Sequence, residues 1–499
     1  MKDYGQSIKK AKDILKIQRY YGSIMALMEW DLWQGLPAEG RSYRQEVSGY
    51  FIKQGLNVIA SDETRRLAEY FKEFGDKKFE NEYDIAVARN LIKSFDRAVK
   101  IPVELQVEMN DFTSEAQMVW REALNKSDFN LYKPYLKKLF ELKVKVAQSI
   151  DKTKNPFDVL VEDVDEGLSV DKVDKLFSEL KTGVIEILGK IKDEHEHIDN
   201  SILNFNVDKQ TVKRIGSKIV EKAFFDANKA SYSEVIHPVC IGVGPSDIRI
   251  TTNYDELMPG IFSFLHECGH GVYEYSSNEK VVDCGIWGGI SGAMHESQSR
   301  FYENIIGKSY EFWQFFYPML QSEVDELKNI DLDAFYKAIN KVKPTLKRLD
   351  ADELTYNLHP IIRFEMEKDY FRGNLKTDDF YEVWNAKYKE YLGMEPKNAR
   401  EGVLQDVHWA SGYIGYFQSY TLGNVYGGQF LNKMLQDVPD LYKQIAAGNF
   451  EPLNRWNYEN IHQYGNLYAP NDLMIKVTGE EIQSKYFLEY LKNKFLKSR

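Results

Sequence analysis

Two histidines and a glutamate stand together in the stretch GIFSFLHECGHGVYEY, residues 260–275. His266 and His270 are four residues apart, so on an α-helix both imidazoles project from one face and reach a single metal ion. Glu267 projects about 100° around the helix from His266, so it lies beside the ion. A carboxylate there can accept a proton from a metal-bound water, the general-base role in the His-Glu-x-x-His pattern. This segment predicts a hydrolytic metal site.

The histidine pair leaves a tetrahedral zinc ion one protein ligand short, since the fourth position of a catalytic site is kept for water. Residues 290–307, ISGAMHESQSRFYENIIG, have the spacing of a second helix that ends at Gly307. Glu296 lies beside the small side chains of this helix, which leave room for a neighbouring helix. We expect Glu296 to complete a His2Glu site, which is the catalytic pattern of zinc coordination.

Each of these residues has a simpler interpretation. The histidine pair is alternatively a satisfied core pair, and Glu296 an ordinary surface glutamate; the apolar helix and the available third ligand favour metal ligation. Cys268 faces away from the histidine pair, so we expect it to be only a small buried residue. The segment EHEH, residues 194–197, alternates charge in polar surroundings and predicts a solvated helix face.

The rest of the chain predicts a mainly α-helical protein. Of its 499 residues 43% are hydrophobic and 14% aromatic, enough for a large core. Helical spacing recurs over residues 8–15, after Ser169, over 335–342 and over 377–393, where Thr377 and Gly393 supply end signals. No linker, charge block or repeat divides the chain, so we expect one catalytic domain, residues 1–499, which leaves a two-lobed form open.

One segment favours β-structure. Residues 238–252, PVCIGVGPSDIRITT, alternate β-branched and polar side chains around residues 247–251. This pattern predicts a short strand or hairpin. This segment ends just before residues 260–275, the predicted metal-binding helix.

Charge and composition exclude several partners. A formal net charge of -11, without a lysine or arginine block, disfavours nucleic acid. The N-terminal residues lack the apolar stretch of a signal peptide, and no run approaches the roughly 18 apolar residues of a membrane span. The three cysteines, Cys240, Cys268 and Cys284, are too few and too scattered for a disulfide framework. We therefore expect a cytoplasmic protein with no membrane partner.

In its motifs the chain resembles the carboxypeptidase Taq family of zinc metallocarboxypeptidases. Five motifs carry the resemblance, in matching order and spacing over the second half of the chain: DIRIT from Asp247, HECGH from His266, HESQS from His295, RLDADELTY from Arg348 and GVLQDVHW from Gly402. The first half is similar only loosely, around Trp30 and Asp31. Two positions depart from the family pattern: Lys347 replaces the usual isoleucine or valine, and Gln418 in GYFQSY replaces a common proline.

The resemblance implies a large helical metallopeptidase fold with a deep central substrate groove and a small β-sheet at the groove edge. It also implies a homodimer and removal of single C-terminal residues from peptides with broad specificity. The expected cofactor is one zinc ion per chain, with cobalt or another divalent metal as the alternative. The expected partners are peptides with a free C-terminus.

The mechanism follows from the chemistry of such a site. Zinc lowers the pKa of its bound water toward about 7, Glu267 takes the proton during attack, and the same glutamate delivers it to the leaving amine. The developing oxyanion needs a second donor. His408 in GVLQDVHW, and Tyr416 or Tyr420 in GYFQSYTLG, are the candidates, and we favour His408 and Tyr420. A packed core tyrosine is the alternative for either ring.

A carboxypeptidase must also bind the free carboxylate of its substrate, and the planar guanidinium of arginine matches that group best. Arg348 in RLDADELTY is the first candidate, with Asp350 and Asp352 expected to hold its guanidinium. Arg249, expected on an edge strand before the metal helix, is the second. Tyr416 is the third expected substrate contact.

Two other classes compete with this interpretation. A zinc endopeptidase or dipeptidase would share every metal residue but lack the carboxylate anchor. A noncatalytic metal-binding or peptide-binding protein would keep the ligands alone. The intact Glu267 argues against the second class, because binding zinc does not require it.

Overall fold

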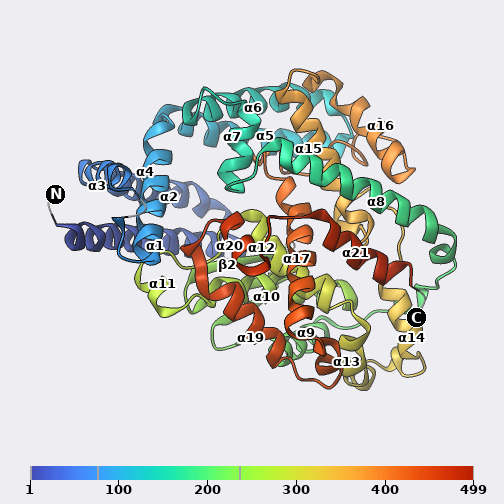
Figure 1. Cartoon of the computed structure of the whole chain (residues 1–499). Helices are drawn as coiled ribbons and strands as arrows, with labels where there is room; N and C mark the ends of the chain where they lie inside the picture. The colour runs from blue at the N-terminus through green and yellow to red at the C-terminus, as the bar shows by residue number, and fades with distance from the viewer. Residues whose placement is uncertain (1–2, 76–77, 235–237, 498–499) are drawn as a thin grey trace.

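The computed structural model describes residues 3–75, 78–234 and 238–497, and these form a mainly helical protein with one small sheet (Figure 1). The predicted fold class is therefore confirmed. Within the described part of the chain, no helix is both long and apolar enough to span a bilayer.

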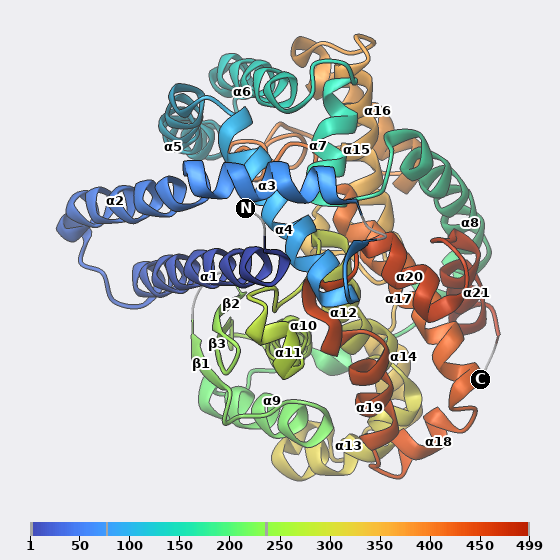
Figure 2. The same ribbon diagram turned by 60° about the vertical axis from the view of Figure 1, so that its left-hand side comes forward.

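The first four helices build a core of their own. They are α1 (Tyr4–Gln34), α2 (Arg41–Ile59), α3 (Asp62–Phe74) and α4 (Glu82–Lys100). Figure 2 shows α1 and α2 side by side, with the small sheet close to α1. Apolar residues of α1, α3 and α4 pack with Val281, Trp287 and Leu467, so this N-terminal layer is joined to the second half of the chain.

A second group of helices lies along the upper side of Figure 1. It consists of α5 (Val103–Lys126), α6 (Phe129–Ile150), α7 (Pro156–Val164), α8 (Val170–Glu196), α15 (Leu358–Phe371) and α16 (Phe380–Leu392). Of the two expected end signals, Gly393 ends α16 with a left-handed φ of 69°, whereas Thr377 begins a short 3-10 turn and α16 starts only at Phe380. At the start of α8, Ser169 Oγ accepts a hydrogen bond from the backbone nitrogen of Lys172. α15 packs against α7, α8 and α16.

A third group lies along the lower side of the same view. It contains α9 (Lys209–Ala223), α13 (Tyr310–Glu323), α14 (Leu332–Ile339), α18 (Leu441–Ala446) and α19 (Glu451–Asn460). The chain ends with α20 (Pro470–Thr478) and α21 (Ser484–Phe495), which both pack against α17.

The sheet has three strands in the order β1-β3-β2: β1 (Ala230–Glu234), β2 (Val239–Gly244) and β3 (Asp247–Thr252). β2 and β3 form the predicted antiparallel hairpin. β1 was not predicted; it pairs in parallel with β3, with Ser231 opposite Arg249. Arg249 therefore lies on the central strand, which corrects the expected edge position. The hairpin is a local pattern, whereas β1 pairs with a strand that is not its neighbour along the chain.

Three helices at the centre carry the predicted chemistry (Figure 1): α10 (Leu257–Tyr275), α12 (Gly292–Arg300) and α17 (Gln418–Asp437). α12 continues as one π-helical turn, Phe301–Ile306. A short helix, α11 (Glu279–Asp283), lies between α10 and α12 along the chain. Two glycines let these helices approach closely. A Cβ on Gly269 would lie 2.7 Å from Ser299 Cα, and one on Gly423 would lie 2.4 Å from Glu296 Cβ. Larger residues at either position would push the helices apart.

The predicted solvated face at residues 194–197 is wrong for His195. Its side chain is buried, and its Nδ1 accepts a hydrogen bond of 2.9 Å from the backbone nitrogen of Val342. Burial also lowers the pKa of His195. The local charge pattern could not show that the end of α8 packs against the segment after α14.

Candidate metal centre and substrate site

The fold brings His266, His270 and Glu296 together. One potential ligand atom from each residue lies within 4.8 Å of the others. The two imidazoles come from one face of α10, with ring centroids 4.9 Å apart and planes at 84°. Glu296 comes from α12, whose close approach depends on Gly269 beside His270. These are the three residues that the sequence predicts as metal ligands: the histidines from their spacing, and Glu296 from the small side chains beside it.

The geometry of this triad suits a divalent ion. Glu296 Oε1 lies 3.9 Å from His270 Nε2, which is too long for a hydrogen bond but fits two ligands around a shared centre. Both side chains are largely buried, 16% exposed for His270 and 7% for Glu296. Buried polar groups that face one another without hydrogen bonding need another partner. Two imidazoles and one carboxylate form the donor set of a catalytic zinc site with an open position.

Glu303, on the π-helical turn, orients the imidazole of His266. His266 Nδ1 donates to Glu303 Oε2 at 2.8 Å, which leaves Nε2 for a metal ion. Although burial opposes ionisation, the hydrogen bond and charge of His266, with the charge of Arg300, hold the pKa of Glu303 at about 2. Sequence reasoning missed Glu303. Its signal was the seven-residue spacing from Glu296, which returns to the same helix face after two turns.

Arg300 joins the two carboxylates around the triad. Its Nε lies 3.3 Å from Glu296 Oε2, and its Nη1 lies 3.9 Å from Glu303 Oε2. The guanidinium stacks over the ring of Tyr356 at 3.8 Å. Arg300 therefore contacts Glu296 from the next turn of α12, and Tyr356 of the RLDADELTY segment covers its guanidinium.

Glu267 is buried beside the triad, as expected for a base. Burial raises its pKa to about 7; the charge of His266 opposes this rise, and the carboxylates of Glu296 and Glu303 add to it. Such a pKa is near the range in which a group gives and takes protons efficiently at neutral pH. Positive charge at the triad would favour the ionised form.

His408 and Tyr420 form a pair. His408 Nε2 lies 2.9 Å from the Tyr420 hydroxyl, and burial lowers the pKa of His408 to about 4 despite the nearby charge of Asp406. The imidazole is therefore neutral near pH 7, and its tautomer decides whether Nε2 donates to the tyrosine hydroxyl or accepts from it. Burial also raises the pKa of Tyr420, so its hydroxyl remains a donor.

Tyr416 lies next to the same group. Its ring centroid is 5.5 Å from that of Tyr420, and its Cε2 would lie 3.4 Å from a Cβ on Gly292 at the start of α12. Burial and then the charge of Glu296 raise the pKa of Tyr416. The three aromatic residues expected from the motifs are thus brought together near the triad.

Arg348 is buried in a network that differs from the expected one. Its Nη1 donates to the Tyr356 hydroxyl at 3.0 Å, and its Nη2 donates to Asp406 Oδ1 at 3.2 Å. Its guanidinium lies 4.8 Å from the ring centroid of Tyr420, and its Nε is buried without a hydrogen-bond partner among the described residues.

The expected clamp of Asp350 and Asp352 around Arg348 is wrong. Asp350 is exposed. Asp352 accepts hydrogen bonds from the backbone nitrogens of Leu354 and Thr355 at 3.0 and 2.9 Å, so it caps its own turn. The short side chain of Asp352 accepts hydrogen bonds from the nearest backbone nitrogens and therefore does not reach the arginine.

Asp406 takes the role expected of Asp350 and Asp352, because its carboxylate accepts hydrogen bonds from two arginines. Arg363 Nε donates to Asp406 Oδ2 at 2.6 Å, on the side opposite Arg348. Burial opposes ionisation, but the charges of Arg363 and Arg348 hold the pKa of Asp406 well below its usual range. Asp406 is the aspartate of GVLQDVHW, two residues before His408, so the motif contained this residue although its role was not inferred.

Arg249 has separate partners. Its guanidinium makes a two-pronged contact with Asp247, at 2.6 and 2.9 Å, and lies 5.9 Å from the ring centroid of Trp30. Its side chain is 30% exposed, against 6% for Arg348. The two candidate anchors thus differ in access to solvent, and the contacts of Arg249 join the sheet to α1.

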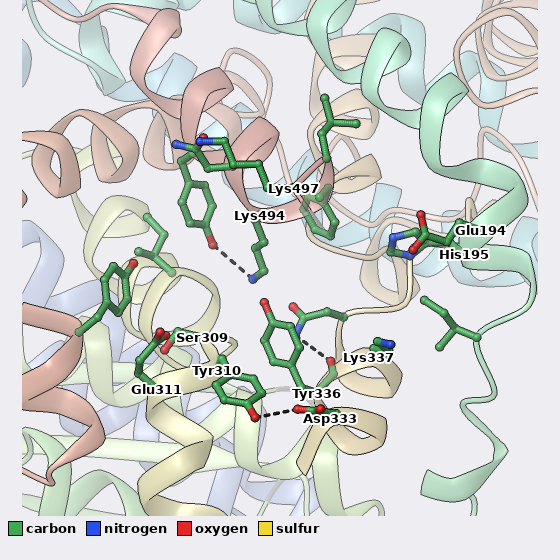
Figure 3. A pocket seen from close by; sticks show the side chains of 18 of the residues that line it. Glu194, His195, Ser309, Tyr310, Glu311, Asp333, Tyr336, Lys337, Lys494 and Lys497 are labelled. Carbon is green, nitrogen blue, oxygen red and sulfur yellow. Dashed lines mark hydrogen bonds between the residues drawn. The ribbon is translucent and has the colours of Figure 1, made fainter. Parts of the chain in front are cut away.

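A cavity of about 1110 Å³ lies away from the triad, between the end of α8, the starts of α13 and α14, and α21 (Figure 3). Tyr490 and Lys494 on its wall donate to the two oxygens of Glu353 at 2.7 and 2.5 Å. The triad does not line this cavity, so it is not the substrate groove that the resemblance implies. That groove stays a prediction.

A helical protein that gathers two histidines, a carboxylate able to bind the same ion and a second, buried glutamate has the construction of a metallopeptidase. Comparison with known proteins agrees. The family model for carboxypeptidase Taq (M32) metallopeptidases matches residues 10–495, so the chain belongs to that family. It is a metallocarboxypeptidase, a peptide hydrolase whose family requires a divalent metal.

Individual relatives extend over nearly the whole chain. Carboxypeptidase 1 of Bacillus subtilis is 36% identical over 487 residues, covering 97% of each chain. Thermostable carboxypeptidase 1 of Pyrococcus furiosus is 33% identical over 479 residues, covering 95% of each. A solved structure of Pyrococcus furiosus carboxypeptidase superimposes with a TM-score of 0.94 at 32% identity, covering 99% of both chains. The M32 carboxypeptidase of Deinococcus radiodurans gives 0.93 at 28% identity, covering 98% of this chain and 99% of that one.

Proposed function

We propose that this enzyme is a zinc-dependent carboxypeptidase of broad specificity, which removes single C-terminal residues with Glu267 as general base. The observation that carries the proposal is the triad of His266, His270 and Glu296, with the buried Glu267 on the same helix as the two histidines. The ordering of His266 by Glu303 supports ligation through Nε2.

A divalent ion bound there would supply an activated water and polarise the scissile carbonyl. Glu267 takes the proton of the attacking water on its carboxylate and passes it to the nitrogen of the leaving residue. The Tyr420 hydroxyl, whose orientation depends on His408 at 2.9 Å, donates to the oxygen that becomes negative. Such a donor is typically worth about 3 kcal/mol of transition-state stabilisation.

Recognition of the substrate terminus is assigned to Arg348. Its guanidinium is held by Asp406 and Tyr356, while Nε is left without a partner among the described residues. Recognition of a main-chain carboxylate is independent of the side chain, which is consistent with broad specificity. Tyr416, next to Tyr420, is proposed as a further substrate contact, and Arg249 as the alternative anchor.

The identity of the metal is tested separately from the reaction. The donor set of two imidazoles and one carboxylate suits zinc, and cobalt fits the same ligands. Elemental analysis of the enzyme purified without added metal should find zinc at one ion per chain. Another divalent ion at that occupancy would replace zinc in the proposal.

The deciding experiment is a digest of a mixed peptide set read by mass spectrometry, with wild type and Glu267→Gln in parallel. Wild type should shorten many peptides by one C-terminal residue at a time. The variant should retain its metal while turnover falls by orders of magnitude, because the amide cannot act as a base. Internal cleavage would favour an endopeptidase, release of dipeptides a dipeptidase, and absence of cleavage a binding protein.

Three further properties remain predictions: a homodimer, a cytoplasmic location and a single catalytic domain over residues 1–499. Light scattering coupled to size-exclusion chromatography tests the first, and limited proteolysis tests the last.

A further inference from the structure

A fully buried aspartate outside the proposed machinery joins two of its helices. Asp165 follows the last residue of α7 and is only 1% exposed. Among the described residues its carboxylate forms no ion pair with a lysine or arginine. A buried carboxylate without a cation is costly unless hydrogen bonds replace its water.

Those hydrogen bonds come from two different helices. The backbone nitrogen of Ala293, in the first turn of α12, donates to Asp165 Oδ1 at 2.9 Å. Ser419 Oγ and Gln418 Nε2, in the first turn of α17, donate to Oδ2 at 2.7 and 3.3 Å. The hydroxyl of Ser291, the N-cap of α12, is a further donor. One carboxylate thus bridges the N-terminal ends of both helices, where a negative charge is most favourable.

Each helix carries a proposed active group a short distance from this bridge. Glu296 follows Ala293 by three residues, almost one turn. Tyr420 follows Ser419 directly. The helices also touch along glycines: a Cβ on Gly292 would lie 2.9 Å from Ser419 Oγ. A shift at the bridge would therefore change the separation between the metal ligand and the oxyanion donor.

We propose that Asp165 is a positioning residue, which sets the distance between Glu296 and Tyr420 by tying the first turns of α12 and α17 to one carboxylate. This inference rests on the roles proposed above for Glu296 and Tyr420. Displacements of about 1 Å in an active site cost up to about 100-fold in rate, so a device that fixes two helices has a large effect on turnover.

Gln418 extends the bridge beyond the two helices. A proline is common at this position in the family pattern, and proline has no side-chain donor for Asp165. Gln418 Nε2 donates both to Asp165 and to the carbonyl of Gly415, at 2.7 Å for the second contact. It therefore links the bridge to the segment that follows His408.

The test compares Asp165→Asn with Asp163→Asn. Asp165→Asn keeps the shape of the side chain but places an amide donor where two hydrogen-bond donors already point. Asp163→Asn changes a more exposed aspartate of α7 that is paired with Arg97. For Asp165→Asn we expect kcat about 10-fold lower with KM within about twofold of wild type, because catalytic groups move while the substrate contacts remain. We also expect a shift in the visible absorption bands of the cobalt-loaded protein, which report on ligand geometry. Asp163→Asn should match wild type in both.

The inference is overturned if Asp165→Asn keeps the wild-type kcat and cobalt spectrum, or if both variants lose the same factor. If Asp165→Asn fails to fold by circular dichroism, Ser419→Ala replaces it, since this change removes the shorter of the two hydrogen bonds from α17 and leaves the one from α12 in place. It should lower kcat several-fold and leave the cobalt spectrum unchanged; an unchanged kcat overturns the inference. If wild type cleaves no peptide, the proposed function fails, while the cobalt spectra, recorded without peptide, still decide whether Asp165 positions Glu296.

Discussion

The imidazole of His266 and the carboxylate of Glu303, 37 residues apart in the chain, meet at 2.8 Å between Nδ1 and Oε2. This contact fixes the ring orientation and leaves Nε2 for a metal ion. The π-helical turn after α12 carries Glu303, so one continuous helical segment supplies both Glu296, the proposed third ligand, and the residue that orients His266.

Replacing Glu303 should weaken metal binding without removing a ligand. For Glu303→Gln we expect an affinity about 10- to 100-fold lower, because the amide orients and polarises the imidazole less well. Competition with a chromogenic chelator measures this affinity. Glu279→Gln, an exposed change on α11, is the matched control and should bind metal like wild type. Equal affinities in both variants would contradict the role of Glu303.

Glu296→Ala should cause a larger loss, because it removes a ligand and leaves only the histidine pair. Elemental analysis after a mild chelator challenge should find little metal in this variant. Glu256→Ala, an exposed change at the start of α10, serves as the control. Full occupancy in Glu296→Ala would show that another residue is the third ligand.

Arg348→Ala should impair recognition of the substrate carboxylate. Losing a charge-assisted contact costs about 1.5 to 3 kcal/mol, which lowers kcat/KM by one to two orders of magnitude with bound metal unchanged. The measurement compares a peptide that has a free C-terminus with its C-terminal amide, for wild type and variant. The loss should be confined to the free acid.

An equal loss on both peptides would instead mean that Arg348 acts through the structure around Asp406 and Tyr420. Arg249→Ala distinguishes the two anchors in the same assay. Because Arg249 is more exposed and is paired with Asp247, its removal should have the smaller effect on the free acid. The reverse order would transfer the anchor role to Arg249.

Glu367 should make stability depend on pH. This carboxyl has no exposed surface and accepts hydrogen bonds from Trp409 Nε1 and the backbone nitrogen of Gly415. Burial raises its pKa from 4.5 to about 8, although those hydrogen bonds oppose the rise. Between these values the folded protein holds a proton that the unfolded chain has released, so the free energy of unfolding falls as pH rises through this window.

Each unit of this pKa difference corresponds to about 1.4 kcal/mol. Glu367→Gln has no titrating group at this position, so it does not lose this stability as the pH rises. The Tm of the variant minus that of wild type should therefore increase from pH 5 to pH 9, the pH range to be used. Thermal unfolding of both proteins at matched metal loading measures the difference. A Tm difference that stays constant across this range would show that Glu367 does not change protonation on folding.

Much of the site was predictable because it depends on local spacing. The four-residue interval between His266 and His270 specifies two ligands on one helix face wherever that helix lies. Glu296 could be chosen because small neighbours mark a helix that packs closely. The hairpin of β2 and β3 and the C-terminal end of α16 were likewise signalled by residues within a few positions. The motif resemblance then indicated the family.

The tertiary structure decided which distant groups meet. Asp406, rather than the nearer Asp350 and Asp352, holds Arg348, although 58 positions separate them. β1 adds to the sheet in parallel, and His195 is buried by a segment far along the chain. Helical period and motif order predicted the candidate metal-binding residues of this protein from the sequence alone. Charge pairing and burial were decided only when packing excluded water, because a buried ionic group takes whichever partner the fold brings within reach.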